Sequence, residues 1–141
     1  MAEGLERFVV AQARVYDQAL AELEAGRKES HWMWFIFPQI AGLGRSGTAR
    51  FYAIASRAEA AAYLSHPLLG SRLAECTAAM LRHSGTPAHF ILGTVDAMKF
   101  HSSMTLFDAV AGEAEPRFAA ALAAFFGGER DQATMELLGR P

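Results

Sequence analysis

Apolar residues recur along most of the chain at spacings of three and four, the period of an α-helix with one face on a core. The longest such stripe consists of Phe8, Ala11, Val15, Ala19 and Leu23. Glu and Arg residues fill the other side of this stripe. The pattern predicts one helix over residues 5–25, ended by Gly26.

Shorter helices are predicted along the rest of the chain, separated by Gly and Pro. We expect them at 57–65, from Leu69 to near Gly85, at 88–92, from the cap candidate Thr94 to Ala111, from Pro116 to Gly127-Gly128, and from the cap candidate Asp131 to Leu138. No stretch alternates apolar and polar residues as a half-buried strand does. The sequence therefore predicts an all-α single domain over residues 1–141, with six or seven helices around an aromatic-rich core.

The stretch HWMWFIFPQIAGLGRSG, residues 31–47, raises a competing interpretation because its glycines match the dinucleotide-binding pattern G-x-G-x-x-G. That pattern requires a preceding strand, a parallel sheet and an acidic residue about 20 positions later. The rest of the chain supplies no further strands, so no parallel sheet can form around this stretch. Glu59 also comes too early to be the acidic residue. We instead expect a short buried helix from about His31 to Phe37, ended by Pro38.

The glycines at 42, 44 and 47 would then form a turn that passes close to another part of the molecule. That neighbour is either another helix or an anion held by backbone N–H groups, with Arg45 and Ser46 assisting. The packing interpretation is favoured.

Composition narrows the function classes. The formal net charge is -2 and the 13 basic residues are scattered, so no nucleic-acid surface is predicted. Cys76 is the single cysteine and falls on an apolar helical stripe, which indicates a buried side chain. The five histidines lack metal-ligand spacing, and we predict no metal and no cofactor. Without a leader-like or membrane-spanning segment, we expect a cytoplasmic protein.

Candidate chemistry lies mainly in DAMKFHSSMTLF, residues 96–107. On a helix, Asp96, Lys99 and Ser103 share one side, and Ser102 neighbours Lys99. A lysine between hydroxyls would bind phosphate or carboxylate, or activate a serine. The alternative is an Asp96–Lys99 surface ion pair with serines bonded to the backbone.

Other polar residues stand in apolar surroundings. His31 is a candidate general base, which makes His31, Lys99, Ser102 and Ser103 the catalytic candidates. The ligand-binding candidates are Lys28, Trp34, Gln39, Arg72 and Asp96. Each also has a structural alternative, such as a helix cap, a turn contact or a core position.

Three blocks, GRKESHWMWFIFPQIAGLGRSG, EAAAYLSHPLLGSRL and DAMKFHSSMTLFDA, resemble the signature blocks of a bacterial family catalogued as domain of unknown function 1810. The resemblance extends from Arg7-Phe8 to the terminal DQATMELL. It implies a compact all-helical domain and no particular activity. Some members carry the label calpastatin, but such inhibitors are disordered and polar, whereas this chain is 52% apolar.

Two functions follow from these observations. In the first, His31, Lys99 and aromatic residues line a pocket for a small anionic ligand, of the nucleotide or phosphosugar kind, as an enzyme or as a sensor. In the second, the domain presents an apolar surface to another protein and catalyses nothing. The sequence names neither the ligand nor the partner.

Overall fold

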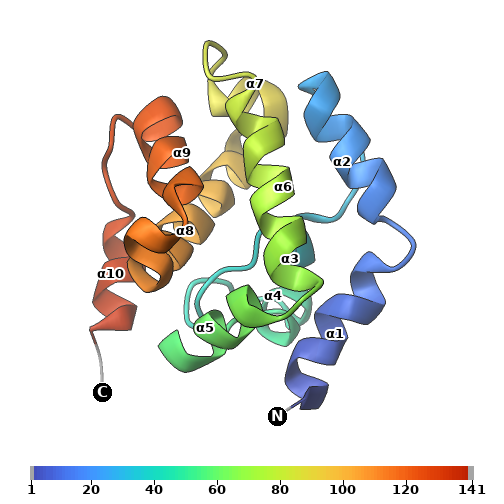
Figure 1. The fold of residues 1–141 in the computed structure, drawn as a ribbon, viewed down its shortest axis with the longest axis vertical. Coiled ribbons are helices and arrows are strands. Elements are labelled where there is room, and N and C mark those ends of the chain that lie inside the picture. The colour runs from blue at the N-terminus through green and yellow to red at the C-terminus, as the bar shows by residue number, and fades with distance from the viewer. Residues whose placement is uncertain (1, 140–141) are drawn as a thin grey trace.

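The computed structural model describes residues 2–139, which form ten α-helices and one 3-10 helix (Figure 1). The helices are α1 (Ala2–Gln12), α2 (Tyr16–Ala25), α3 (Met33–Ile36), α4 (Gly47–Phe51), α5 (Arg57–Ser65), α6 (Leu69–Leu81), α7 (Ala88–Leu92), α8 (Thr94–Ala111), η1 (Gly112–Ala114), α9 (Pro116–Phe126) and α10 (Gln132–Leu138). The all-α prediction is confirmed. The number of helices is higher than the six or seven expected, in part because the predicted helix over 5–25 is two helices and because α4 was not predicted.

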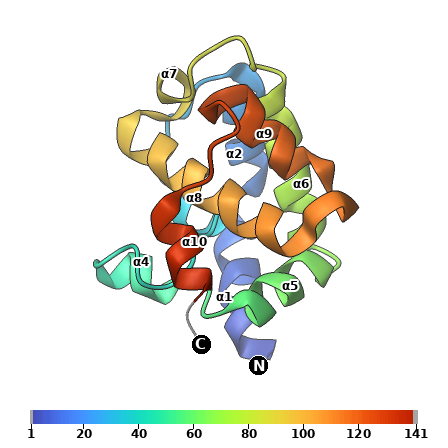
Figure 2. The same ribbon diagram turned by 90° about the vertical axis from the view of Figure 1, so that its left-hand side faces the viewer.

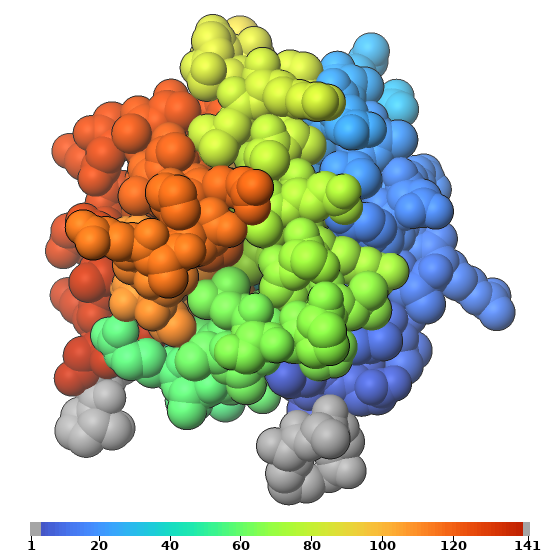
Figure 3. Space-filling view, in the orientation of Figure 1, coloured from blue at the N-terminus to red at the C-terminus, as the bar shows by residue number. Residues whose placement is uncertain are grey.

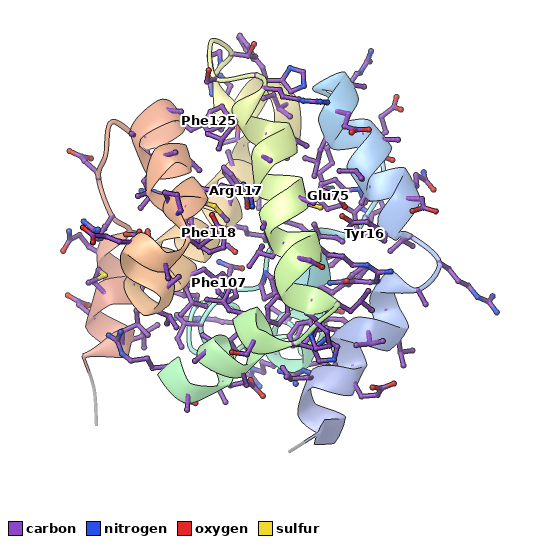
Figure 4. The ribbon with its side chains drawn as sticks, in the orientation of Figure 1. Tyr16, Glu75, Phe107, Arg117, Phe118 and Phe125 are labelled. Carbon is purple, nitrogen blue, oxygen red and sulfur yellow. The ribbon has the colours of Figure 1, made fainter. Side chains whose placement is uncertain are left out.

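Helix α8 is the centre of the fold. It contacts α5, α7, α9 and α10, and Figure 2 shows α10 lying across it. Aromatic rings join it to its neighbours: Phe100 meets Phe37 with centroids 4.8 Å apart, and Phe107 meets Phe118 at 5.9 Å. Figure 4 labels Phe107 of α8 and Phe118 of α9. Because α8 packs on several sides, most of its second half is buried.

The predicted helix over 5–25 is wrong as a single element. The chain leaves helical geometry after Gln12 and resumes it at Tyr16, so α1 and α2 meet at an angle (Figure 1). No Gly or Pro marks this break. The Gln12 side chain is instead buried and donates to the Phe35 carbonyl at 2.7 Å, which fixes the end of α1 against α3.

Several other boundaries follow their local signals. Pro116 begins α9, Gly127 ends it with φ +62°, and the Asp131 carboxylate caps α10 by accepting from the Thr134 N–H. Thr94 is not the cap of α8, because Gly93 occupies that position. The helix expected to reach Gly85 ends at Leu81.

The segment between α3 and α4 is held by backbone pairing. Ile40 and Ile54 form an isolated parallel bridge, in which Ile54 N–H donates to the Gln39 carbonyl and Ala41 N–H donates to the Ile54 carbonyl, both at 2.8 Å. The glycine turn packs against helices, as the favoured interpretation predicts. A Cβ on Gly42 would lie 3.1 Å from Leu137 of α10, and one on Gly44 would lie 2.4 Å from the Ala49 Cβ of α4.

No helix within residues 2–139 is both long and apolar enough to cross a membrane.

Candidate functional site

A groove of about 310 Å³ lies between the glycine turn, the first half of α8 and the start of α10. Its lining residues are Gln39, Leu43, Gly44, Val95, Met98, Lys99, Ser102, Asp131 and Ala133. Three of the predicted site residues, Gln39, Lys99 and Ser102, therefore come together here. We call this cavity the α8–α10 groove.

Lys99 carries the positive charge of the groove. Its ammonium lies 4.8 Å from the centre of the Trp34 ring and 3.5 Å from Asp96 Oδ1. The other oxygen of Asp96 pairs with Lys28 Nζ at 2.9 Å. Two ammonium groups thus share one carboxylate, so these three side chains together carry one net positive charge. Since the Lys28 side chain is only 9% exposed and that of Lys99 is 24% exposed, solvent reaches this charge mainly at Lys99.

Lys28 is held by the segment between α2 and α3. Its backbone N–H donates to the Ile91 carbonyl at 2.8 Å, and its ammonium donates to the Ser30 carbonyl at 2.7 Å. The same ammonium lies 5.0 Å from the centre of the Trp32 ring. Lys28 therefore pairs with Asp96 on the side away from the groove, and its ammonium is held by these contacts.

Glu22 organises this segment. Its carboxylate accepts from Glu29 N–H, from the N–H and hydroxyl of Ser30, and from Trp32 Nε1 at 2.9 Å. Burial by itself raises the pKa of Glu22, but the hydrogen bonds outweigh it and lower the pKa to about 2. The apolar stripe predicts that Glu22 lies on the polar side of its helix, but the residue is only 7% exposed. The unpaired N–H groups of the following segment require this buried acceptor.

Asp131 closes the other side of the groove. Its Oδ2 accepts from Ser102 Oγ at 3.3 Å, from Thr134 Oγ1 at 2.6 Å and from Thr134 N–H at 3.1 Å. The Asp131 N–H donates to Thr105 Oγ1 at 2.9 Å. These bonds fix the start of α10 onto α8. The sequence marked Asp131 as a helix cap and gave no signal that it would also face a cavity.

Gln39 joins the groove to a smaller cleft that contains Trp34. This cleft shares Gln39 and Gly44 with the groove and is otherwise lined by Ile40, Ala49, Tyr52 and Ala53. The bridge to Ile54 positions the backbone of Gln39, and the close contact at Gly44 brings the turn against α4. Trp34 therefore touches the site through its ring, beneath Lys99.

The remaining candidates lie elsewhere. His31 is exposed on the segment before α3 and does not line the groove. Ser103 is fully buried, and its hydroxyl has no hydrogen-bond partner within residues 2–139. The groove is thus lined by Ser102 and not by its neighbour, because the two side chains point to different sides of α8.

Arg72 belongs to a separate, partly buried cluster between α1, α2 and α6. Its guanidinium donates to Gln12 Oε1 at 3.2 Å and lies 4.5 Å from the centre of the Tyr16 ring. Tyr16 donates to the Glu75 carboxylate, and Figure 4 shows these two side chains meeting between α2 and α6. The neighbouring Cys76 is fully buried in the core, as predicted, and this burial raises the pKa of its thiol to about 12.

A larger hollow of about 530 Å³ lies between α5, α6, η1 and α9. Figure 3 shows it at the front of the molecule, between α9 and α6. Small side chains such as Ala61, Ala74 and Ala114 line much of it, and Arg117 stands at its edge beside Glu115. None of the predicted site residues lines this hollow. Within residues 2–139, no group of three His, Cys, Asp or Glu side chains could hold a metal ion.

Comparison with known proteins agrees with the resemblance seen in the sequence. The family model described as Protein of unknown function (DUF1810) matches residues 2–138. The chain belongs to this family. The chain is similar to a conserved hypothetical protein from Mycobacterium tuberculosis, Rv1873, with 50% sequence identity over 97% of each chain. The crystal structure of that protein matches the fold with a TM-score of 0.93. No curated protein matches the chain significantly. These similarities establish the family and the fold of this DUF1810 member and name no activity.

Proposed function

We propose that the α8–α10 groove binds a small organic anion, with Lys99 as its countercharge. The observation that carries the proposal is the arrangement of two ammonium groups around the single carboxylate of Asp96. An anion at Lys99 would complete this arrangement without displacing Lys28. The partly buried setting strengthens such an interaction, since the effective dielectric constant is lower than that of water.

The rest of the groove suits an organic ligand. Gln39 and Ser102 offer hydrogen-bonding groups, and Leu43, Val95 and Met98 offer apolar contacts. Small-molecule sites are usually concave and lined by apolar side chains with a few polar groups among them. The proposal concerns binding, because the hydroxyl of Ser102 donates to Asp131 and no histidine lines the groove.

A thermal-shift titration of the whole chain tests this proposal. The probes are inorganic phosphate, adenosine monophosphate, glucose 6-phosphate and an apolar carboxylate, 4-methylpentanoate. A ligand at 100 times its dissociation constant adds about 2.7 kcal/mol, which raises the Tm by several degrees. Lys99→Met keeps the apolar stem and removes the charge, so it should abolish the shift. Arg14→Met, at an exposed position, is the control and should keep it.

No shift with any anion, or equal shifts in Lys99→Met and the parent, would overturn the proposal.

The second candidate function is recognition of another protein. It is favoured by three large apolar side chains on α7 and the start of α8: Phe90, Val95 and Met98 are 70%, 66% and 68% exposed. Surfaces of this kind mark interaction sites. Under this function, Phe90→Ser with Met98→Ser would abolish capture of a partner while Lys99→Met would leave capture intact.

A further inference from the structure

We propose further that the ligand of the α8–α10 groove is a zwitterion of the amino-acid type with an apolar side chain. Its carboxylate would lie at Lys99 and its ammonium at Asp131. This inference rests on the proposed function and deepens it. It starts from the fact that Lys99 and Asp131, which carry opposite charges, line the same cavity.

Asp131 has an acceptor oxygen to spare. The three hydrogen bonds that its carboxylate receives from residues 2–139 all go to Oδ2, which leaves Oδ1 available. The adjacent cation does not neutralise it, because Arg130 Nη2 pairs with Asp108 Oδ2 at 2.7 Å. Asp131 is in none of the ion pairs among these residues. No ion pair among these residues therefore neutralises its negative charge at the edge of the groove.

Ser102 lines the groove together with Lys99 and Asp131. Ser102 follows Lys99 by three residues on α8, a rise of about 4.5 Å, and its hydroxyl is 3.3 Å from Asp131 Oδ2. A ligand that carries both an ammonium and a carboxylate satisfies both sides. A phosphate ester would gain from Lys99 but would also face the carboxylate of Asp131.

Size and lining agree with this class of ligand. A volume of about 310 Å³ is at the lower end of the range for small-molecule sites, which runs from about 300 to 1,000 Å³. Leu43, Val95 and Met98 form the apolar part of the wall. Val95 and Met98 are both about two-thirds exposed, so an alkyl side chain would remove apolar surface from water.

Three matched probes test the inference by calorimetric titration of the whole chain. L-leucine carries both charges, 4-methylpentanoate lacks the ammonium, and 3-methylbutylamine lacks the carboxylate. We expect leucine to bind at least tenfold more tightly than either of the others. This comparison uses the unmodified protein and does not depend on the folding of any variant.

Variants then assign the charges. Asp131→Asn keeps a cap that accepts from Thr134 N–H, since Asn is as good a cap as Asp, and removes the charge. It should weaken leucine binding at least tenfold and leave the binding of 4-methylpentanoate equal or tighter. Lys99→Met should weaken both.

The outcomes separate this inference from the proposed function. If 4-methylpentanoate or a phosphate ester binds as tightly as leucine, and Asp131→Asn leaves leucine binding unchanged, the zwitterion is ruled out and anion binding stands. If no anion binds at Lys99, the proposed function falls as well.

Discussion

At the scale of single residues, Glu22 holds together the segment that carries the polar side chains behind the site. It is buried, and it accepts four hydrogen bonds from the segment that carries Lys28 and Trp32. A buried carboxylate is stable only when such donors replace its water. Glu22 thereby fixes Lys28, and Lys28 fixes the Asp96 that faces Lys99.

The lowered pKa of Glu22 predicts how stability depends on pH. Its pKa is about 2 in the folded protein, against an ordinary value of 4.5, so the stabilisation is complete above about pH 4.5 and disappears as the pH falls toward 2. Replacing Glu22 with Gln should lower the free energy of unfolding by about 2–3 kcal/mol at pH 7. Urea unfolding at a series of pH values should show this difference shrinking below pH 4.5.

The matched control is Glu24→Gln. Glu24 is an exposed carboxylate whose pair with Arg82 is 3.7 Å long, and such surface pairs contribute at most about 1 kcal/mol. A difference between Glu22→Gln and the parent that stays constant from pH 7 to pH 2 would show that the carboxylate charge is not the stabilising feature.

At the scale of elements, the glycine turn and α4 depend on close packing. Gly44 has an ordinary backbone conformation, yet an added Cβ would lie 2.4 Å from the Ala49 Cβ, a contact that neither group can relieve by rotation. Gly44→Ala should therefore lower the free energy of unfolding by about 1–3 kcal/mol, the usual cost of overpacking. Chemical denaturation measures the change directly.

Gly47 is the control within the same turn. A Cβ there meets nothing within 4 Å, and Gly47 is the first residue of α4. Gly47→Ala should leave stability unchanged or raise it by up to about 1 kcal/mol, because Ala favours the helix. Equal losses of stability in both variants would show that this turn requires glycine for its backbone flexibility and not for the close contact with Ala49.

The elements also show which parts of a fold a sequence can predict. Local chemistry marks the ends of α9 and the start of α10, since Pro116, Gly127 and Asp131 act on their own backbone, and these predictions are confirmed. The break after Gln12 has no local signal, and the Gln12 side chain at this point bonds to Phe35, 23 residues away. Short α4 was missed for a different reason: its five residues bury no side chain, so they show no apolar stripe.

At the scale of the whole molecule, local signals likewise predict some residues of the candidate site and miss those that long-range contacts bring there. Lys99, Ser102 and Asp96 were recognised together because they share one helix, and Trp34 because it lies in the aromatic stretch of residues 31–47. Arg72 was grouped with them on residue type alone, and the fold places it in the Gln12 cluster instead. Asp131 was not recognised as a cavity residue, since its contact with Ser102 joins residues 29 positions apart.

The continuous core predicts that the chain unfolds as one unit. Phe107 is fully buried and contacts Tyr63 of α5 and Phe118 of α9, whereas Trp32 and Trp34 lie at α3, in the same hydrophobic cluster. Unfolding followed by Trp fluorescence and by far-UV circular dichroism should therefore give the same midpoint.

Phe107→Ala makes this test sharp. The substitution should destabilise the protein by about 3–5 kcal/mol. It should move the fluorescence and circular dichroism transitions together, although the fluorescent residues Trp32 and Trp34 lie in another part of the core. A fluorescence transition that stays at its original midpoint while the helical signal moves would mean that α3 and its neighbours form an independent unit. Coincident transitions would mean that the α8–α10 groove, which joins the α3–α4 segment to α8 and α10, is held by the stability of the entire domain.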